Sequence, residues 1–322
     1  MKITKKTILV TGATGFIGSN LLNKISTTDK YSIVAVWHNH PPSVEHNSIK
    51  YIKADLRNLS DCERILEDID YVFMLAGRLS TTAIMNDHPL GPITENTTIH
   101  LNMLDASYRA NIEKYLWLSS TTGYPEFDHP LKEDEFFLSE PPSIYKPVGW
   151  MSRYIEKVCS MYVEKCGRPS TIISLRPTAV YGPFDDFDYD TCHALPALVR
   201  RISEEHNPVD IWGLGEDLRD WLFVDDLIDA CLNAIEMITG YDAINIGSGN
   251  PCNLNQIASY LVEIADRPNI QVRHLDSNRS TNLRRQIDCS YASERINYYP
   301  RTDIRSGLRK TFDWYKYRLQ IQ

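Results

Sequence analysis

Three glycines directly after a short apolar segment restrict what the N-terminal part of this chain can fold into. Gly12, Gly15 and Gly18 follow Thr7–Val10, a predicted β-strand, and open an apolar-striped helix that continues to about Ile25. Gly12 allows a tight turn, Gly15 lets backbone approach a pyrophosphate, and Gly18 lets the helix pack on the strand. The helix N-terminus offers free N–H groups to the anion, so the pattern predicts a dinucleotide site rather than a merely structural turn. The residues expected to contact the cofactor here are Gly12, Thr14, Gly15, Phe16, Ile17 and Gly18.

Short apolar segments alternate with helical patterns through the first half of the chain. Further strands are expected at residues 33–37, 49–53, 71–75, 115–119 and 171–175. Further helices are expected from a capping box at Ser60–Glu63, at about 95–110 and at about 149–165. Strands that alternate with helices pair in parallel. The sequence therefore predicts an α/β fold with a Rossmann-type doubly wound parallel sheet.

The alternation of strands and helices stops after Arg176. Prolines and glycines interrupt the chain there, and Asp185–Asp190 forms an acidic-aromatic loop. Asn253–Gln256 resembles a helix cap before another apolar-striped segment. We expect a smaller C-terminal substrate-binding lobe in this half. The expected division is 1–176, rejoined by about 225–250, for the dinucleotide-binding domain, and 177–224 with 251–322 for the lobe.

Charge and composition exclude several other classes of function. The chain carries 34 Lys and Arg residues against 42 Asp and Glu residues without a long basic run, so nucleic acid is not an expected partner. No apolar run approaches the length of a membrane span, and the basic N-terminus lacks a signal-peptide core. The 7 cysteines are scattered without a CxxC pair, which favours reduced thiols in a cytoplasmic protein. No metal site is predicted.

The expected ends of the second, third and fourth strands bear on which dinucleotide is bound. Trp37–His40 contains no acid for the ribose 2′-hydroxyl of NAD and no Arg suited to the 2′-phosphate of NADP. The missing acid favours NADP slightly over NAD. Asp55 and Leu56 are expected to bracket the adenine, although Asp55 could be a simple turn residue. Ala76 and Arg78 are expected over the pyrophosphate crevice, although Arg78 could be a solvated loop cation.

Four segments carry motifs with a recognisable pattern. They are Thr11–Gly18, a GxxGxxG turn; Leu118–Pro125, a Ser-rich strand end; Arg176–Pro183, an RPxxxYGP segment; and Arg219–Asp226, similar to RxFxxVDD. Together they resemble the extended short-chain dehydrogenase/reductases of the NAD-dependent epimerase/dehydratase family, which act on nucleotide sugars. Within that family, the run Tyr181–Leu198 most resembles the GDP-L-fucose synthases, which epimerise and reduce GDP-4-keto-6-deoxymannose.

The resemblance implies roles for several residues. Ser120 would hydrogen-bond the sugar oxygen that becomes, or was, a carbonyl, and His193 would act as an acid or base. Thr122 stands where the GDP-L-fucose synthases carry a Cys that acts in epimerisation, and its hydroxyl is a far poorer acid than a thiol. The other implied substrate contacts are Thr121, the aromatic Trp212, and a diphosphate clamp of Arg201, Arg219 and Arg285. Alternatives are a salt bridge from Arg219 to Asp225–Asp226 and burial of Trp212 in the core.

The Tyr-x-x-x-Lys pair of this family is not intact. In the family the Tyr phenol transfers a proton, and the Lys lowers its pKa and holds the nicotinamide ribose. Tyr145 has no Lys four residues later, and aligning the helix by its other residues places Val148 and Ser152 at the two positions. We expect Tyr145 to act as the acid or base. A cation, Arg153 or Lys146, or the nicotinamide charge itself, would assist it.

These expectations combine into one enzyme hypothesis with two alternatives. The chain would bind NAD(P) and a nucleotide-diphosphate sugar, with a GDP sugar favoured, and would reduce, oxidise or epimerise the hexose at or beside C4. One alternative is an epimerase or dehydratase with a tightly bound, recycled cofactor. The other is a catalytically weak protein that binds cofactor and sugar nucleotide. The resemblance also implies a homodimer through the helices near 95–110 and 149–165.

Overall fold

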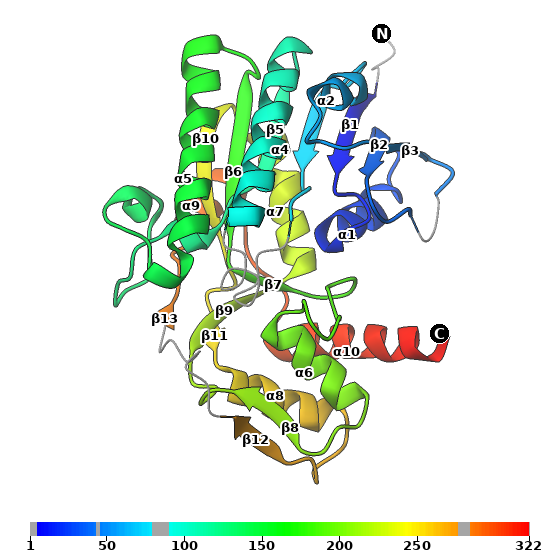
Figure 1. The fold of residues 1–322 in the computed structure, drawn as a ribbon, viewed down its shortest axis with the longest axis vertical. Coiled ribbons are helices and arrows are strands. Elements are labelled where there is room, and N and C mark those ends of the chain that lie inside the picture. Colours follow the sequence, from blue (N-terminus) through cyan, green and yellow to red (C-terminus); the bar gives the residue numbers. More distant parts are fainter. Residues whose placement is uncertain (1–4, 43–45, 79–89, 276–283, 322) are drawn as a thin grey trace.

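A seven-stranded parallel sheet forms the upper part of the molecule in Figure 1. The computed structural model describes residues 5–42, 46–78, 90–275 and 284–321. All neighbouring strands of this sheet run parallel. In spatial order the strands are β3 (Ile49–Lys53), β2 (Tyr31–Trp37), β1 (Lys6–Thr11), β4 (Tyr71–Met74), β5 (Lys114–Leu118), β6 (Thr171–Pro177) and β10 (Gly240–Ile246).

The chain winds outward from β1 in one direction and then crosses over to wind outward in the other. The crevice between the carboxyl ends of β1 and β4 is therefore the point where the strand order reverses. Doubly wound sheets bind ligands outside such a crevice. The observed order confirms the predicted fold class.

Helices cover both faces of the sheet. α1 (Phe16–Ile25) and α7 (Val224–Met237) pack together on one face. α2 (Leu59–Ile65), α4 (Leu90–Arg109) and α5 (Lys146–Met161) cover the other face, where α4 and α5 stand side by side in Figure 1. Successive side chains of a strand point to opposite faces. The three apolar residues at the centre of β1 are divided in this way, because Ile8 and Val10 belong to one core and Leu9 to the other.

The lower part of the molecule in Figure 1 is a smaller lobe of helices and short strands. Its sheet consists of β7 (Ala179–Tyr181), β9 (Leu218–Phe223), β11 (Pro251–Cys252) and β13 (Arg284–Arg285). A separate pair of strands is formed by β8 (Val209–Trp212) and β12 (Val272–Leu275). The helices of this lobe are α6 (Ala194–Ser203), α8 (Leu254–Ile264) and α10 (Ile304–Ile321), whereas α9 (Ser290–Ile296) packs against α7 and β10 in the upper part. One apolar cluster runs from the α1–α7 face of the large sheet into this lobe.

Two predictions about helix starts have opposite outcomes. The cap before α8 is confirmed, since Asn253 and Gln256 form a reciprocal capping box. The capping box predicted at Ser60–Glu63 is wrong, because α2 begins earlier, after Asn58. Asp61 in that segment accepts a hydrogen bond from the Asp55 amide and pairs with Arg64 instead.

A buried ion pair holds together the carboxyl ends of β5, β6 and β10. The guanidinium of Arg176 on β6 lies 2.6 Å from the Glu156 carboxylate on α5, and both side chains are at most 3% exposed. Glu156 also accepts a hydrogen bond from Ser119 Oγ at 2.5 Å, and Ser119 directly precedes Ser120 in the chain. Arg176 donates to the Tyr124 hydroxyl, which itself donates to Asn245 on β10. One pair thus joins β6, α5, the end of β5 and β10.

We predict that Glu156→Gln lowers the free energy of unfolding by about 3–5 kcal/mol, because it leaves the buried Arg176 cation without its counter-charge. Denaturant unfolding followed by circular dichroism measures this. Glu140→Gln is the matched control: Glu140 pairs with Lys146 on the surface, and its loss should cost no more than about 1 kcal/mol. Equal losses from both variants would contradict the role given to the buried pair.

Candidate functional site

The glycine turn between β1 and α1 has the geometry expected of a phosphate-binding loop. Gly12 has φ +62°, and a Cβ there would lie 2.8 Å from the Leu75 carbonyl oxygen. A Cβ on Gly18 would lie 2.1 Å from the Gly12 carbonyl oxygen, so only glycine lets α1 approach the turn. A Cβ on Gly15 would meet protein only at 3.2 Å, and this residue lines a cleft. The space in front of Gly15 is therefore open to a ligand.

The turn is also tied to the end of β4. The Thr11 hydroxyl oxygen accepts hydrogen bonds from the backbone amides of Leu75 and Ala76, each at 3.1 Å. The ends of β1 and β4 are thereby held at a fixed separation at the reversal point of the sheet. This is the place where a pyrophosphate would sit.

The cleft has a volume of about 1130 Å³ and collects most of the predicted site. The predicted residues that line it are Gly12, Thr14, Gly15, Phe16, Ile17, Gly18, Ala76, Arg78, Ser120, Thr121, Thr122, Tyr145, His193 and Arg219. Asp55, Leu56, Arg201 and Trp212 are not among its lining residues. The guanidinium of Arg201 donates to the Asp210 carbonyl oxygen, and Trp212 is 52% exposed, so Trp212 is not the core residue of the alternative. Arg285 is described by its backbone, which pairs with Arg219 across β13 and β9.

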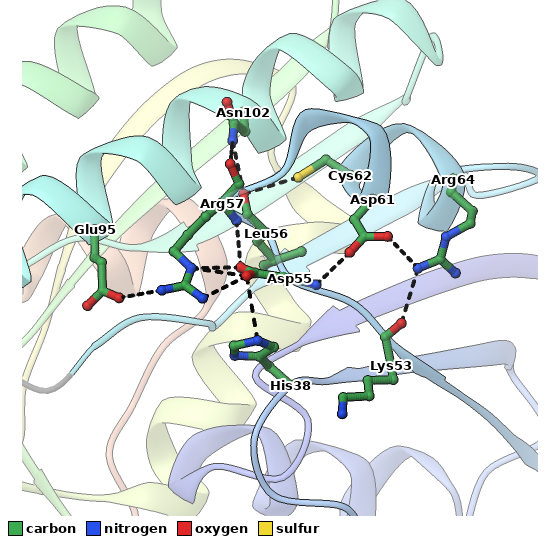
Figure 2. A network of polar contacts seen from close by, with 10 residues as sticks. All are labelled: His38, Lys53, Asp55, Leu56, Arg57, Asp61, Cys62, Arg64, Glu95 and Asn102. Carbon is green, nitrogen blue, oxygen red and sulfur yellow. Dashed lines mark hydrogen bonds and ion pairs between the residues drawn. The ribbon is translucent and has the colours of Figure 1, made fainter.

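A network of charged side chains occupies the ends of β2 and β3, as Figure 2 shows. Arg57 forms an ion pair with Asp55 at 2.7 Å and a second with Glu95 at 3.0 Å. Arg78 pairs with the other oxygen of Glu95 at 2.7 Å, and His38 Nε2 lies 3.6 Å from Asp55. The Arg57 guanidinium lowers the pKa of Asp55 to about 2. Asp55 is therefore ionised and paired, and it also accepts the Arg57 amide at 3.0 Å, as the turn residue of the alternative would.

This network corrects one statement drawn from the sequence. Trp37–His40 itself contains no Arg, but the fold brings Arg57 beside His38 from the loop after β3. Arg57 is distant from His38 in the sequence, so the sequence analysis did not identify it as a neighbour. Asn102 and Cys62 donate to the Leu56 carbonyl oxygen and hold that loop in place.

Two hydroxyls meet at the end of β5. Ser120 precedes a short 3-10 turn, Thr121–Gly123, and its Oγ accepts from the Thr122 amide at 3.1 Å. The Thr122 hydroxyl donates to the same oxygen at 2.8 Å. With its oxygen engaged twice, Ser120 can direct its own hydroxyl proton to a ligand oxygen in the cleft.

His193 stands at the start of α6 and is open to solvent through the cleft. Desolvation by the surrounding cleft walls, and secondly the positive charge of Arg219, lower the pKa of His193. The neutral imidazole is therefore favoured. Arg219 does not pair with Asp225–Asp226 as the alternative required. Its nearest carboxylate is Asp217 at 3.9 Å, and Asp226 accepts backbone amides from the segment before α10.

Neither of the two cations expected to assist Tyr145, Arg153 and Lys146, is directed at the cleft. Tyr145 lies in the 3-10 turn before α5 and lines the cleft, as do Val148 and Ser152 one and two turns later. The Arg153 guanidinium is buried and donates to the carbonyl oxygens of Gly123 and Ser139. Lys146 pairs with Glu140 at 2.9 Å. The predicted assistance from Arg153 or Lys146 is therefore wrong, because both groups are committed away from the cleft.

One residue of the cleft wall escaped the sequence analysis. His100 lies on α4, one turn after Asn96, and both line the cleft. The side chain of Asn96 accepts a hydrogen bond from the Arg78 backbone amide and donates one to the Arg78 carbonyl oxygen. Two polar residues at i and i+4 on the buried face of a helix were the signal that could have indicated this position.

Comparison with known proteins agrees with this geometry. The family model described as the NAD dependent epimerase/dehydratase family matches residues 8–247, and the chain belongs to this family. GDP-L-fucose synthase 1 of Arabidopsis thaliana is 28% identical over 317 residues, covering 96% of this chain and 92% of the relative. The solved UDP-glucose 4-epimerase of Thermotoga maritima with UDP-glucose superposes with a TM-score of 0.86 at 25% identity, covering 97% and 99% of the two chains.

A second solved structure contains the cofactor. The UDP-glucuronic acid 4-epimerase of Bacillus cereus, in complex with UDP-glucuronic acid and NAD, has a TM-score of 0.83 at 26% identity, and the match covers 97% and 99% of the chains. The open space before Gly15 and the N-terminus of α1, which has no side-chain cap, fit a dinucleotide pyrophosphate. None of the described helices is long and apolar enough to cross a membrane.

We predict that Gly15→Val lowers NAD(P)H affinity at least tenfold, about 1.4 kcal/mol, because its branched side chain fills the space needed by the pyrophosphate. Fluorescence titration with NADPH and NADH measures this. The fold should survive, since Gly15 has φ −83° and a Cβ there meets only one backbone oxygen. Gly18→Ala is the contrasting variant and should lower the melting temperature. Unchanged affinity in Gly15→Val would refute the site.

Proposed function

We propose that the protein is an NAD(P)-dependent enzyme that reduces, oxidises or epimerises a nucleotide-diphosphate hexose at or beside C4. One observation carries this proposal: a single cleft is lined by an open phosphate turn, by Ser120, whose Oγ accepts two hydrogen bonds, and by the solvent-exposed His193. When bound, the cofactor would accept or deliver a hydride. Membership of the family supports the reaction class.

The residues of this chain would divide the remaining work. Gly12–Gly18 would hold the dinucleotide, and Ser120 would donate a hydrogen bond to the sugar oxygen as negative charge develops on it. Thr122 would act as a positioning residue for Ser120 rather than as an acid, because its proton already bonds Ser120 Oγ. Tyr145 or His193 would exchange the proton with the sugar. Epimerisation through the residue at 122 is not part of this proposal.

We propose a preference for NADP over NAD. Trp37, at the end of β2, is no acceptor for a ribose hydroxyl, and the ammonium of Lys53 stands 5.2 Å from its ring centroid. Arg57 and His38 add further basic groups at the same edge. Because Asp55 and Glu95 already pair with Arg57, the Coulomb attraction for a 2′-phosphate would come mainly from Lys53. A lower dissociation constant for NADPH than for NADH in the titrations of the unmutated protein supports the preference.

We also propose a homodimer formed through α4 and α5. The exposed large apolar side chains of these helices include Tyr108, Trp150, Tyr154 and Met161. Exposed large apolar side chains on two helices that pack side by side are typical of an interface.

We predict that a GDP sugar stabilises the protein more than a pyrimidine nucleotide sugar does. The support is the similarity of the run Tyr181–Leu198 and of the full chain to GDP-L-fucose synthases. Thermal shifts with GDP-mannose, UDP-glucose and dTDP-glucose at equal concentration decide this. A larger shift with either pyrimidine ligand would favour the nucleotides bound by the solved epimerases instead.

We predict that His193→Asn lowers turnover at least tenfold, about 1.4 kcal/mol of transition-state stabilisation, with little change in melting temperature. The reason is that the imidazole faces the cleft rather than the core. Activity per folded molecule and melting curves measure the two effects. A collapse of the melting temperature with normal residual activity would assign His193 to the core.

We predict that Tyr145→Phe lowers turnover at least a hundredfold, about 2.7 kcal/mol, and leaves NAD(P)H affinity unchanged. Val148→Ala is the matched control on the same cleft wall and should be nearly silent. Product formation is measured on a panel of nucleotide sugars, and released NAD(P)H or NAD(P)⁺ separates net redox chemistry from a recycled cofactor. Full activity of Tyr145→Phe would transfer the proton step to His193 or water.

The second candidate function, binding without rapid turnover, has one specific observation in its favour. Val148 and Ser152 line the cleft at the two positions where the family's Tyr and Lys are expected. The double variant Val148→Tyr with Ser152→Lys rebuilds that pair. A protein that binds nucleotide sugars but turns none over, and gains turnover in the double variant, would be the binding protein of this alternative.

A further inference from the structure

A buried imidazole in the cleft wall has an unmatched polar atom. His100 on α4 is 7% exposed and lines the cleft. Its ring stands edge-on to Trp117 of β5, with 4.9 Å between the ring centroids. None of the described residues hydrogen-bonds its Nδ1. A buried polar atom without a partner costs about 1–3 kcal/mol, so such an atom beside a cleft indicates a missing partner.

The imidazole is suited to a neutral hydrogen bond rather than to an ion pair. Burial lowers the pKa of His100 to about 4, so the ring is neutral at physiological pH. A neutral imidazole has one nitrogen that donates and one that accepts. A half-turn about the Cβ–Cγ bond exchanges the two edges of the ring. A hydroxyl group, which both donates and accepts, is therefore a matching partner in either tautomer.

The position of His100 selects one half of a bound dinucleotide. The charged network of Arg57 and Asp55 marks the adenosine end, over β2 and β3. His100 lies on the other side of the reversal point, against Trp117 of β5, and the preceding turn of α4 bonds the backbone after β4 through Asn96. A dinucleotide that crosses the crevice at the glycine turn places its nicotinamide half on this side. The hydroxyls of that half belong to its ribose.

The part of the neighbouring helix α5 that lines the cleft brings no cation there. Val148 and Ser152 of α5 line the same cleft, and neither brings a cation or a long polar side chain. We propose that His100 is a cofactor-binding residue that hydrogen-bonds a ribose hydroxyl in the nicotinamide half of the dinucleotide. This inference rests on the dinucleotide binding proposed above. It adds a contact that does not depend on the Tyr-x-x-x-Lys positions.

The variant His100→Leu tests the inference through binding and stability rather than activity. Leucine removes the unmatched polar atom, so the cofactor-free protein should melt at the same or a higher temperature. NAD(P)H affinity, from fluorescence titration, should fall at least tenfold. Affinity for ADP, which contains only the adenosine half, should stay within twofold by calorimetry. His100→Gln, whose amide can also bond a hydroxyl, should recover part of the NAD(P)H affinity.

A matched control lies two turns further along the same helix. Ser107 on α4 is fully buried, its Oγ is also unpartnered among the described residues, and it does not line the cleft. Ser107→Ala should preserve stability as His100→Leu does, but it should leave both NAD(P)H and ADP affinity unchanged. A fall in NAD(P)H affinity in both variants would show that α4 packing is the cause and would overturn the assignment.

The remaining outcomes also decide the question. Unchanged NAD(P)H affinity in His100→Leu would make His100 an ordinary core residue and would leave the proposed function standing. Parallel losses of NAD(P)H affinity, ADP affinity and melting temperature would assign it a purely structural role. Failure of the unmutated protein to bind either dinucleotide would overturn the proposed function and this inference together.

Discussion

The buried pair of Arg176 and Glu156 is the interaction on which the arrangement of the cleft depends. Both charges are removed from water, so each is tolerated only because the other lies 2.6 Å away and hydrogen bonds satisfy the remaining atoms. The pair ties β6 to α5, and Ser119 extends it to the end of β5, one residue before Ser120. The hydroxyl that faces the cleft is thus placed by a charge pair below it. A small shift of α5 would move Ser120 and Tyr145 together.

The backbone position of the phosphate turn, Gly12–Gly18, is determined in a different way. It is set by steric exclusion, because Gly12 and Gly18 occupy spaces where a Cβ would overlap backbone. Thr11 then fixes the turn to β4 with two amide bonds. The end of the cleft at the phosphate turn is consequently defined by backbone packing, and the end at Ser120 and His193 by polar side chains and the loop before α6. Substitutions at the two ends should fail for different reasons: loss of space at one, and loss of charge balance at the other.

Local patterns predicted the elements, and contacts distant in sequence decided the site. The parallel sheet, the glycine turn and the cap of α8 follow from apolar runs, φ requirements and capping chemistry that lie within a few residues of one another. Arg57 and Glu95 are separated by 38 residues, so no local pattern indicates that they meet. Arg153 has the charge expected beside Tyr145, but its direction is set by carbonyls of the 123–139 segment. From the sequence alone, His100 would be assigned to the core, and only the folded structure shows that it lines the cleft.

The cleft can accept an anionic ligand although the protein carries a net charge of −8. Arg78, Arg219 and Arg318 line it, and the first turn of α1 adds unpaired amides without an acidic residue. Two of the acids at its edge are held closer to neutrality. Burial raises the pKa of Asp185 to about 8, and burial also raises that of Asp220, whose oxygens accept from Ser248 and Gly249. A diphosphate entering this cleft therefore meets Arg219 and Arg318 together with an Asp185 carboxyl whose negative charge is weakened by burial.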